Sequence, residues 1–351
     1  ELKTKPCRQI HLGGGTPTFL SPASLDELLG GIRERIQIDN KAFEGSVEVD
    51  PRRTTREQLE VMFKHGIHRI SLGVQDFNSE VQRLVNRIQP FEITRQMTTW
   101  ARELGYDSVN FDLIYGLAKQ TPESMKETAL KTVELRPDRI ALYSFALVPW
   151  IKPAQRLFKD EDLPKADAKL ELFAITREVL LNAGYLEIGM DHFALPNDGL
   201  VLAQNESSLH RNFMGYTDRK TDVLLGLGVS SISETPLSFH QNEKVLAAYE
   251  QRLAKGEFAT FRGHVLDSED RNRRAQILEV MTRFQVQLEP SQKIAAPEFL
   301  HEMIEDGLVQ IDGDLLKVTK SGRPFLRNAC LFFDERLRAK QPQTRLFSQS
   351  I

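Results

Sequence analysis

Glycine and polar residues follow several strand-like segments of this chain, and they are residue types that can hold a polar cofactor. Gly13, Gly14, Gly15 and Thr16 come directly after the strand-like segment Arg8–Leu12. Three adjacent glycines allow a ligand to approach the main chain closely, because no side chain stands in the way. A glycine run alone is most often a turn, so its weight depends on the residues that accompany it.

Carboxylates and amides stand at the ends of the following predicted strands. Glu48 and Asp50 end the second strand, and later strands end at Gln75, at Asp112 and at 144–146. Carboxylates accept hydrogen bonds from ribose hydroxyls or an ammonium group, and an amide both donates and accepts. Each residue alone is more simply explained as a helix cap or a hydrated rim position. The whole set, with the glycine run, favours a ligand that carries hydroxyl or ammonium groups.

Four cationic or potentially cationic residues could contact acidic groups of a ligand. They are Arg87, His192, His210 and Arg211, and the last three stand among aromatic residues. An arginine can bind a carboxylate through two parallel hydrogen bonds. Each also has a structural explanation, since Arg87 could be a solvated helix charge and a single histidine is usually a structural residue. A second glycine-rich turn, 226–230, could approach the same ligand.

Strands alternate with helices from residue 8 to about 190. Ser24 with Glu27 predicts a capping box for a helix through Arg35, and Thr54 with Glu57 predicts a second one. The other predicted strands are 46–50, 67–73, 108–113, 139–143 and 185–188. The other predicted helices are 93–104, 121–135 and 166–183. Gly66 ends the helix that Thr54 begins, and Gly105 and Gly184 end the helices 93–104 and 166–183. This alternation predicts an α/β fold with a parallel sheet. No G-x-G-x-x-G follows a strand, so a barrel is favoured over a dinucleotide-binding fold.

The sequence changes character after about residue 235, where helical segments are predicted. Residues 268–351 contain basic helices and one β-like stretch, Gly307–Val318. We therefore predict two domains: a partial barrel over residues 1–265, and a mainly helical, winged-helix-like domain over residues 266–351.

The composition is that of an ordinary globular protein of 351 residues, with 40% hydrophobic and 27% charged residues. A net charge of −3 argues against a nucleic-acid binder. No apolar run is long enough for a membrane helix. Only two cysteines occur, Cys7 and Cys330, which is typical of a reducing cytoplasm. We take a cytoplasmic monomer as the expectation.

A series of motifs in a fixed order gives the chain a specific resemblance. They are GGGTPTFL, VEVDP, SLGVQDFN, VQRLVNR, NFDLIYGL, GMDHFA, HRNFMGY and GLGVSSIS. Together they resemble the oxygen-independent coproporphyrinogen III oxidases of the radical S-adenosylmethionine (SAM) superfamily, from about residue 8 to 280 and more loosely beyond. The resemblance implies a three-quarter (βα)6 barrel, SAM and a [4Fe–4S] cluster. It also implies oxidative decarboxylation of coproporphyrinogen III to protoporphyrinogen IX through a 5′-deoxyadenosyl radical, in haem biosynthesis.

The resemblance also implies roles for individual residues. The SAM-binding residues would be Gly14, Gly15, Thr16, Glu48, Gln75, Arg87, Asp112, Ala146 and Ile232. Two SAM sites are implied, with Gly14, Glu48 and Ile232 in one and the remaining residues in the other. His192, His210 and Arg211 are candidates for the substrate carboxylates. An electron donor for the cluster is implied as a partner.

The chain departs from the family pattern at the cluster itself. The family's C-x-x-x-C-x-x-C loop is absent, and Cys7 has no partner cysteines near it. As written, the chain cannot hold the cluster and would be inactive. Because Arg8–Leu12 reads as an internal strand, we expect the functional protein to carry a preceding strand and the three cysteines upstream of Glu1.

Two other functions remain open at this stage. A sister family of haem chaperones shares the barrel and SAM motifs, although HRNFMGY and GMDHFA favour the oxidase. A barrel enzyme that binds a phosphorylated metabolite at 13–15 is the second alternative. No nucleophile–base–orienter triad is visible, which fits chemistry carried by a cofactor.

Overall fold

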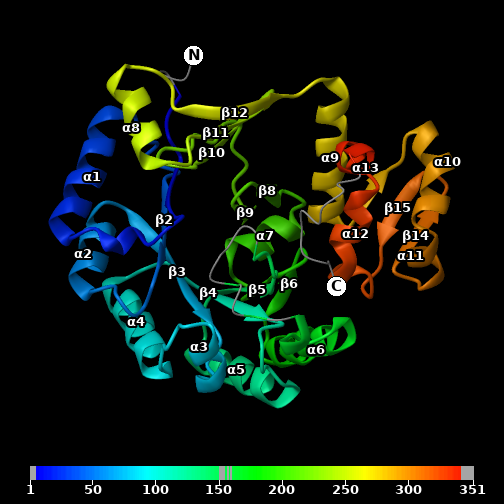
Figure 1. The fold of residues 1–351 in the computed structure, drawn as a ribbon, viewed down its shortest axis with the longest axis horizontal. Helices are drawn as coiled ribbons and strands as arrows, with labels where there is room; N and C mark the ends of the chain where they lie inside the picture. The colour runs from blue at the N-terminus through cyan, green and yellow to red at the C-terminus, as the bar shows by residue number, and fades with distance from the viewer. Residues whose placement is uncertain (1–4, 150–154, 156–157, 159, 341–351) are drawn as a thin grey trace.

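The computed structural model describes residues 5–149, 155, 158 and 160–340, and its centre is a seven-stranded sheet (Figure 1). The strand order is β1-β2-β3-β4-β5-β7-β6. The bounds are β1 Gln9–Leu12, β2 Glu44–Val49, β3 Ile67–Gln75, β4 Ser108–Tyr115, β5 Arg139–Ser144, β6 Leu186–Ile188 and β7 His192–Ala194. Strands β1 to β5 are all parallel. The five strands predicted between residues 8 and 143 are therefore confirmed, with shifts of up to two residues at their ends.

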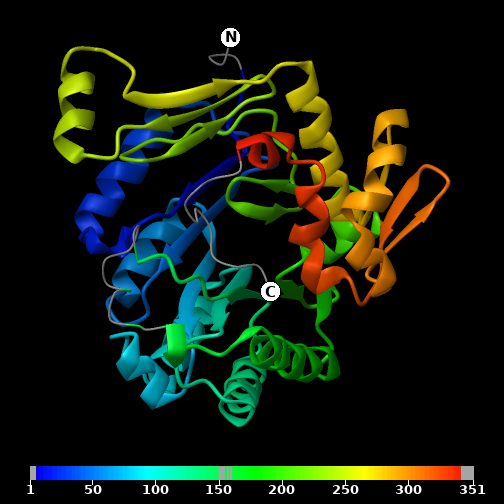
Figure 2. The same ribbon diagram turned by 45° about the vertical axis from the view of Figure 1, so that its right-hand side comes forward.

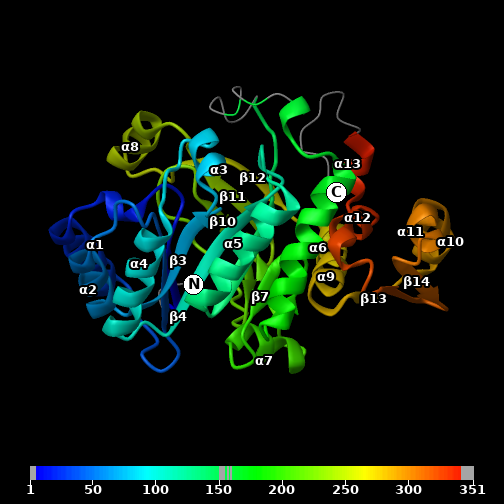
Figure 3. The same cartoon turned by 90° about the horizontal axis from the view of Figure 1, so that it is seen from below.

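Between β1 and β5 each crossover leads to the neighbouring strand, so the parallel part of the sheet is singly wound. The helices are α1 Pro22–Arg35, α2 Arg56–Lys64, α3 Ser79–Leu84, α4 Phe91–Leu104, α5 Pro122–Leu135 and α6 Ala166–Asn182. Figures 1 and 3 show α1, α2, α4, α5 and α6 side by side along the outside of the sheet. The opposite face of the sheet is left without helical cover from these crossovers.

The two faces of the parallel strands differ in chemistry, because side chains alternate along a strand. Apolar side chains point toward the helices and form the main core; they include Val47, Val49, Ile70, Leu72, Phe111, Leu113, Ile140 and Leu142. The alternate positions on the other face carry His11, Ser46, Glu48, Ser71, Gly73, Asn110, Asp112 and Tyr143. We call this second set of residues the polar face.

Both predicted capping boxes are wrong in position. Helix α1 begins at Pro22, and its N-cap is Ser21, whose hydroxyl accepts from the Ser24 N–H. A proline fits the first helical turn, where its missing N–H costs nothing, so the helix starts earlier than Ser24 predicted. In α2 the capping box is formed by Thr55 and Gln58, one residue after the predicted pair. Thr54 instead bonds to the Asp50 carbonyl.

The predicted strand 185–188 exists as β6, but its neighbour is not β5. Strand β7 lies between them and pairs antiparallel with both. Its three residues follow β6 after a tight turn at Gly189, whose φ is 60°. A three-residue strand is too short to show a period in the sequence, which is why β7 was missed. The expectation of a purely parallel sheet is therefore wrong at this edge.

The prediction of helical segments after residue 235 is also wrong in part. A three-stranded antiparallel sheet forms there from β10 Ile232–Glu234, β11 Ser238–Asn242 and β12 Thr260–Val265, with α8 Leu246–Ala254 between the last two. Helix α7 Gly199–Asn205 and the hairpin of β8 His210–Asn212 and β9 Gly215–Thr217 precede it. Figure 2 shows this sheet near the amino-terminal strand β1.

The carboxyl-terminal segment combines helices with a small antiparallel sheet. The helices are α9 Ser268–Arg283, α10 Pro290–Phe299, α11 His301–Glu305, α12 Leu326–Leu331 and α13 Glu335–Lys340; the strands are β13 Gln285–Gln287, β14 Val309–Asp312 and β15 Leu315–Val318. The β-like stretch 307–318 is thus the hairpin β14–β15, which turns at Gly313 with φ 62°.

A second apolar core joins this segment to the end of the large sheet. Ile188, Met190 and Ala194 belong to the same cluster of buried side chains as Val280 and Phe333. The division into domains at residues 265 and 266 therefore stays a prediction. No helix within the described part of the chain is long and apolar enough to cross a membrane.

Candidate functional site

The glycine run after β1 lies against Glu48 of β2. The Gly14 N–H donates to Glu48 Oε2 at 3.4 Å, and Gly14 has a φ of 98°. A Cβ at Gly13 would lie 2.6 Å from His11 Nε2, so a side chain there would collide. A Cβ at Gly14 or Gly15 would meet no atom within 4 Å, so the main chain is open on that side. Thr16 makes no side-chain cap bond to the short helix that follows.

Glu48 is held by His11 of β1, which in turn contacts Ser46 of β2. His11 Nε2 lies 3.4 Å from Glu48 Oε1, and its Nδ1 lies 2.8 Å from Ser46 Oγ. The hydrogen bond from His11 is the main cause that lowers the pKa of Glu48, and burial opposes it. Its side chain is 49% exposed, so the carboxylate can still reach a ligand.

Asp112 of β4 is the second carboxylate of the polar face. Its Oδ2 accepts from Ser71 Oγ and its Oδ1 from Asn110 Nδ2, both at 3.0 Å. Burial is the main cause that raises the pKa of Asp112 to about 6; the Glu48 charge acts in the same direction, and the Ser71 bond opposes the shift. The two carboxylates therefore sit on one face but in opposite electrostatic environments.

Gln75 and Arg87 lie at the carboxyl end of β3. Gln75 has a φ of 68°, at a register irregularity between β3 and β4. A non-glycine residue there costs about 1–2 kcal/mol, and such strain often occurs at functional sites. Arg87 Nη2 donates to the Gly73 carbonyl at 2.7 Å and lies 3.7 Å from Asp50 Oδ1. Arg87 Nε is buried without a partner among the described residues.

Ala146 and Ile232 lie further from this group. Ala146 follows β5, and its carbonyl accepts from Gln155 Nε2 at 3.1 Å. Ile232 begins β10 and pairs with Gln241 of β11. Among the hydrogen bonds and ion pairs of the described residues, none joins Ile232 to Glu48 or Asp112. Figures 1 and 2 show the β10–β12 sheet beside the amino-terminal strands. The strand that Ile232 begins therefore lies near the strand that leads into the glycine run.

His192 of β7 lies within a small aromatic and charged cluster at the other end of the polar face. Its Nδ1 is 2.6 Å from Asp191 Oδ1, and both side chains are nearly buried. The ring meets Tyr143 edge-on at 6.0 Å and Tyr216 at 5.3 Å between ring centroids. His192 also interacts favourably with the Asp112 carboxylate. This links β7 to the acids of β2 and β4.

The two remaining candidates, His210 and Arg211, are neighbours on strand β8, and neighbouring residues of a strand face opposite ways. The Arg211 guanidinium lies 5.6 Å from the Tyr216 ring centre and interacts with Asp191. His210 instead faces Lys220, Glu234 and Arg274, and burial with these cations lowers its pKa. The structure therefore brings Arg211 and His192 together and leaves His210 outside their group.

Several residues of the site were not predicted from the sequence. They are His11, Ser46, Ser71, Asn110, Tyr143 and Asp191. The available signal was the period of two within each strand, because Ser46 and Glu48, or Asn110 and Asp112, are two residues apart. Our prediction considered the ends of strands and overlooked this alternation.

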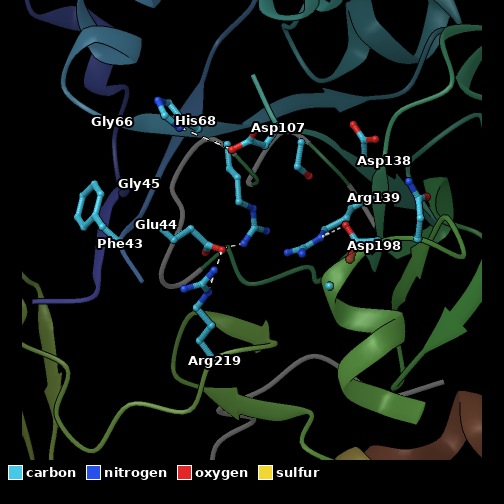
Figure 4. Close-up of a pocket in the computed structure, with 14 residues that line it drawn as sticks. Phe43, Glu44, Gly45, Gly66, His68, Asp107, Asp138, Arg139, Asp198 and Arg219 are labelled. Atoms are coloured by element: carbon cyan, nitrogen blue, oxygen red, sulfur yellow. Dashed lines mark hydrogen bonds and ion pairs between the residues drawn. The ribbon is translucent and has the colours of Figure 1, made fainter. Parts of the chain in front are cut away.

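A separate polar pocket of about 260 Å³ lies at the opposite, amino-terminal ends of the strands (Figure 4). Arg139 Nε and Asp198 Oδ2 form a buried ion pair of 2.6 Å there, and Arg69 Nη1 lies 2.6 Å from Glu44 Oε1. Arg219 also approaches Glu44, at 3.7 Å. These ion pairs anchor the segment after β7 at this end of the sheet, and Arg69 Nε is buried without a partner among the described residues. No predicted site residue lines this pocket.

The described residues do not fit an iron–sulfur cluster. They contain no group of three or more His, Cys, Asp or Glu side chains that could hold a metal ion. Cluster ligands are thiolates. Burial raises the pKa of both thiols, to about 12 for Cys330, and Cys7 donates to the Gln9 carbonyl. Neither cysteine therefore has, among the described residues, the further ligands that a cluster needs.

The polar face does fit SAM. The open main chain at Gly14 and Gly15 offers room and N–H groups for a carboxylate, and the acids Glu48 and Asp112 match an ammonium group and ribose hydroxyls. The unpaired Nε of Arg87 is a further donor toward the same end of the sheet.

Comparison with known proteins places this fold and this site in one class. Residues 1–131 match the radical SAM superfamily. The chain is 43% identical to an oxygen-independent coproporphyrinogen III oxidase of Escherichia coli over 95% of its length and 75% of that protein, and 39% identical to one of Synechocystis over 99% and 77%. The solved structure of coproporphyrinogen III oxidase (HemN) from Escherichia coli matches with a TM-score of 0.87 and 42% identity, over 94% of this chain and 78% of that one.

The protein is thus a radical SAM protein with an α/β fold. Within that superfamily, it belongs to the oxygen-independent coproporphyrinogen III oxidases. Membership implies SAM and a [4Fe–4S] cluster as cofactors. The chain spans about three quarters of the length of the curated relatives that it matches.

Proposed function

We propose that this protein oxidatively decarboxylates coproporphyrinogen III to protoporphyrinogen IX without oxygen, as a step of haem biosynthesis. Two propionate side chains become vinyl groups. In each, the bond to the carboxylate carbon breaks and CO2 leaves, while the side-chain carbon next to the pyrrole ring loses one hydrogen. The proton and two electrons released would be taken up by one SAM molecule, which is cleaved to methionine and 5′-deoxyadenosine. The observation that carries the proposal is the polar face, where two carboxylates and an open glycine run meet in a chain of this family.

The residues that would hold SAM follow from this geometry. Gly15 and Thr16 would receive its amino-acid end, and Gln75, Arg87 and Asp112 would contact the ribose and adenine. Ala146 would line the same pocket. Gly14, Glu48 and Ile232 would hold a second SAM, with Glu48 accepting from its ammonium group.

When bound, SAM would supply the group that abstracts one hydrogen atom from the substrate. The residues of this chain bind and orient. Glu48 stays ionised, because the His11 bond lowers its pKa. Asp112 is held by Ser71 and Asn110 so that its oxygens keep one direction. Arg211 would supply positive charge, and His192 a ring nitrogen, for a substrate that carries four carboxylates.

The finer features of fold and context belong to the same proposal. A singly wound parallel sheet with its helices on one side supports a partial (βα)6 barrel, followed by a mainly helical domain after residue 265. An electron donor for the cluster is expected as a partner. We also propose a monomer in the cytoplasm, in keeping with two cysteines that are both free.

Anaerobic turnover tests the proposal. With a reconstituted cluster, SAM and a reductant, the protein should convert coproporphyrinogen III to protoporphyrinogen IX. Chromatography of the oxidised porphyrins measures this conversion. The Glu48→Gln variant should lose most of this activity, because an uncharged amide attracts an ammonium group less strongly. Haem binding without any decarboxylation would contradict the proposal and favour a haem chaperone.

A further inference from the structure

We infer that Arg327, on helix α12 of the carboxyl-terminal segment, binds a carboxylate of the porphyrinogen substrate together with Arg211 and His192. This inference rests on the proposed function and adds a residue that comes from outside the large sheet. Figures 1 and 2 show α12 alongside the β6–β7 end of that sheet.

The first argument is an excess of positive charge around one buried carboxylate. Asp191 is 12% exposed and faces His192 at 2.6 Å on one oxygen and Arg327 Nη2 at 3.8 Å on the other. Arg211 also interacts favourably with it. One carboxylate cannot balance the charges of two arginines, so the group has an unused attraction for a further anion.

The second argument is that the donors of Arg327 are largely unused. Its distance of 3.8 Å to Asp191 is too long for a hydrogen bond. Its Nε donates to Met190 Sδ at 3.2 Å, and a thioether sulfur is a weak acceptor. The side chain is 64% exposed. A guanidinium in this state has at least two N–H groups ready for a carboxylate.

The third argument concerns the neighbouring arginine on the hairpin β8–β9. Arg211 Nε is buried and has no partner among the described residues. Its guanidinium packs on the Tyr216 ring, whose hydroxyl bonds to the Met281 carbonyl of α9. Arg211 thus lies beside Asp191, and its Nε still lacks an acceptor among the described residues.

The cationic group around Asp191 also lies near the acids of the polar face. Tyr143 is 37% exposed, contacts His192 and feels the charges of Asp112, Glu48 and Arg211. Tyr143 is therefore within reach of the acids of the polar face, of Asp191 and of Arg211. A polyanionic ring would be repelled by the acids and held by the cations, which orients it beside the proposed SAM position.

Arg323, four residues earlier, shows what a purely structural arginine looks like here. It lies 3.4 Å from Glu187 Oε2, covers the Phe284 ring at 4.2 Å and is 24% exposed. Arg336 on α13 is 55% exposed, like Arg327, but its Nε is 2.6 Å from Asp270 Oδ1. Arg336 is therefore a matched control: a comparably exposed arginine whose charge is already paired.

Fluorescence titration of the full chain with two porphyrins, in the absence of SAM, tests the inference. Coproporphyrin III carries four carboxylates and protoporphyrin IX carries two. We expect Arg327→Gln to weaken coproporphyrin binding about tenfold, as the loss of one charge-assisted bond predicts, and protoporphyrin binding clearly less. Arg327→Lys should recover part of the affinity, and Arg336→Gln should match the wild type. Urea midpoints should be unchanged, because Arg327 is mostly exposed.

Each outcome of this titration supports or overturns the inference. Equal binding by Arg327→Gln and Arg336→Gln would overturn the inference and leave the proposed function intact. An equal loss for both porphyrins would also overturn it, since that indicates lost packing rather than carboxylate recognition. If the wild-type chain bound neither porphyrin, the proposed function itself would fail.

Discussion

Two carboxylates on one sheet face are driven in opposite directions by their surroundings. A hydrogen bond from His11 lowers the pKa of Glu48, whereas burial raises the pKa of Asp112 to about 6. Such separation assigns different tasks to chemically similar groups. Near neutral pH Glu48 is a permanent anion, while Asp112 lies close enough to its pKa to respond to a ligand.

The raised pKa of Asp112 has a consequence for stability. A carboxyl whose pKa is higher in the folded than in the unfolded state makes folding less favourable once it ionises. Its share of stability is complete below the unfolded value of 3.8 and is lost as the pH rises through about 6. A shift of about two units corresponds to at most about 3 kcal/mol.

We therefore expect Asp112→Asn to unfold at higher urea concentration than the wild type near pH 7.5, and to show a smaller advantage near about pH 4.5. The amide keeps an acceptor for Ser71 and cannot ionise. Urea unfolding at both pH values measures the difference. An advantage that does not change with pH would show that Asp112 titrates normally.

At the scale of elements, Gln58 of α2 fixes the loop that carries the glycine run. Its Nε2 donates to the carbonyls of Thr18 and Leu20 at 2.8 and 2.7 Å, and its Oε1 accepts from the Thr55 N–H. The side chain is buried. One amide thus caps a helix and holds the segment that begins directly after Thr16.

We expect Gln58→Ala to destabilise the protein by about 2–3 kcal/mol, since it leaves buried carbonyls unpaired. SAM affinity should fall as well, because the glycine run loses its anchor. Thr55→Ala is the control: it removes the cap alone and should cost about 1 kcal/mol with unchanged SAM affinity. Urea unfolding and calorimetry measure both effects, and equal SAM affinity in the two variants would refute the anchoring role.

The joint beneath the sheet depends on a buried ion pair. Asp198 pairs with Arg139 at 2.6 Å and also caps α7 through the Leu200 N–H. We expect Asp198→Ala to cost about 3–5 kcal/mol, because it leaves a buried guanidinium without its partner. Glu103→Ala removes the partner of Arg56 in an exposed pair and should cost less than about 1 kcal/mol. Comparable losses in thermal unfolding would contradict this ranking.

Long periodic elements could be predicted from the sequence, whereas short ones could not. Helix ends with glycine at residues 66, 105 and 184 were correct, and all three have positive φ. Strand β7 and the sheet β10–β12 were missed, because strands of three to six residues are too short to show a local period. The capping residues differ from the predicted ones because several hydroxyl residues stand near the start of each helix. The backbone geometry decides which of them caps it.

The candidate site was predictable to a similar degree. Acids at strand ends were visible as residue types, and the structure brings Glu48 and Asp112 onto one face. Asp191 and Arg327 were not visible, since 136 positions separate them and only tertiary packing brings them to 3.8 Å.

At the scale of the whole molecule, the second core crosses the predicted domain boundary. Ile188, Leu200 and Leu209 pack in one cluster with Val280 and Leu326. We expect a fragment ending at residue 265 to expose this apolar surface and to bind a hydrophobic dye, whereas the complete chain should not. A fragment with native-like circular dichroism and cooperative unfolding would show that the boundary separates independent domains.

Calorimetric titration with SAM tests the central claim, that the polar face holds this cofactor, most directly. The wild-type protein should bind SAM, Glu48→Gln and Asp112→Asn should each bind at least about tenfold more weakly, and Glu103→Gln, on the outer helices, should bind as the wild type does. If SAM bound equally well to all four proteins, the polar face would not be its site.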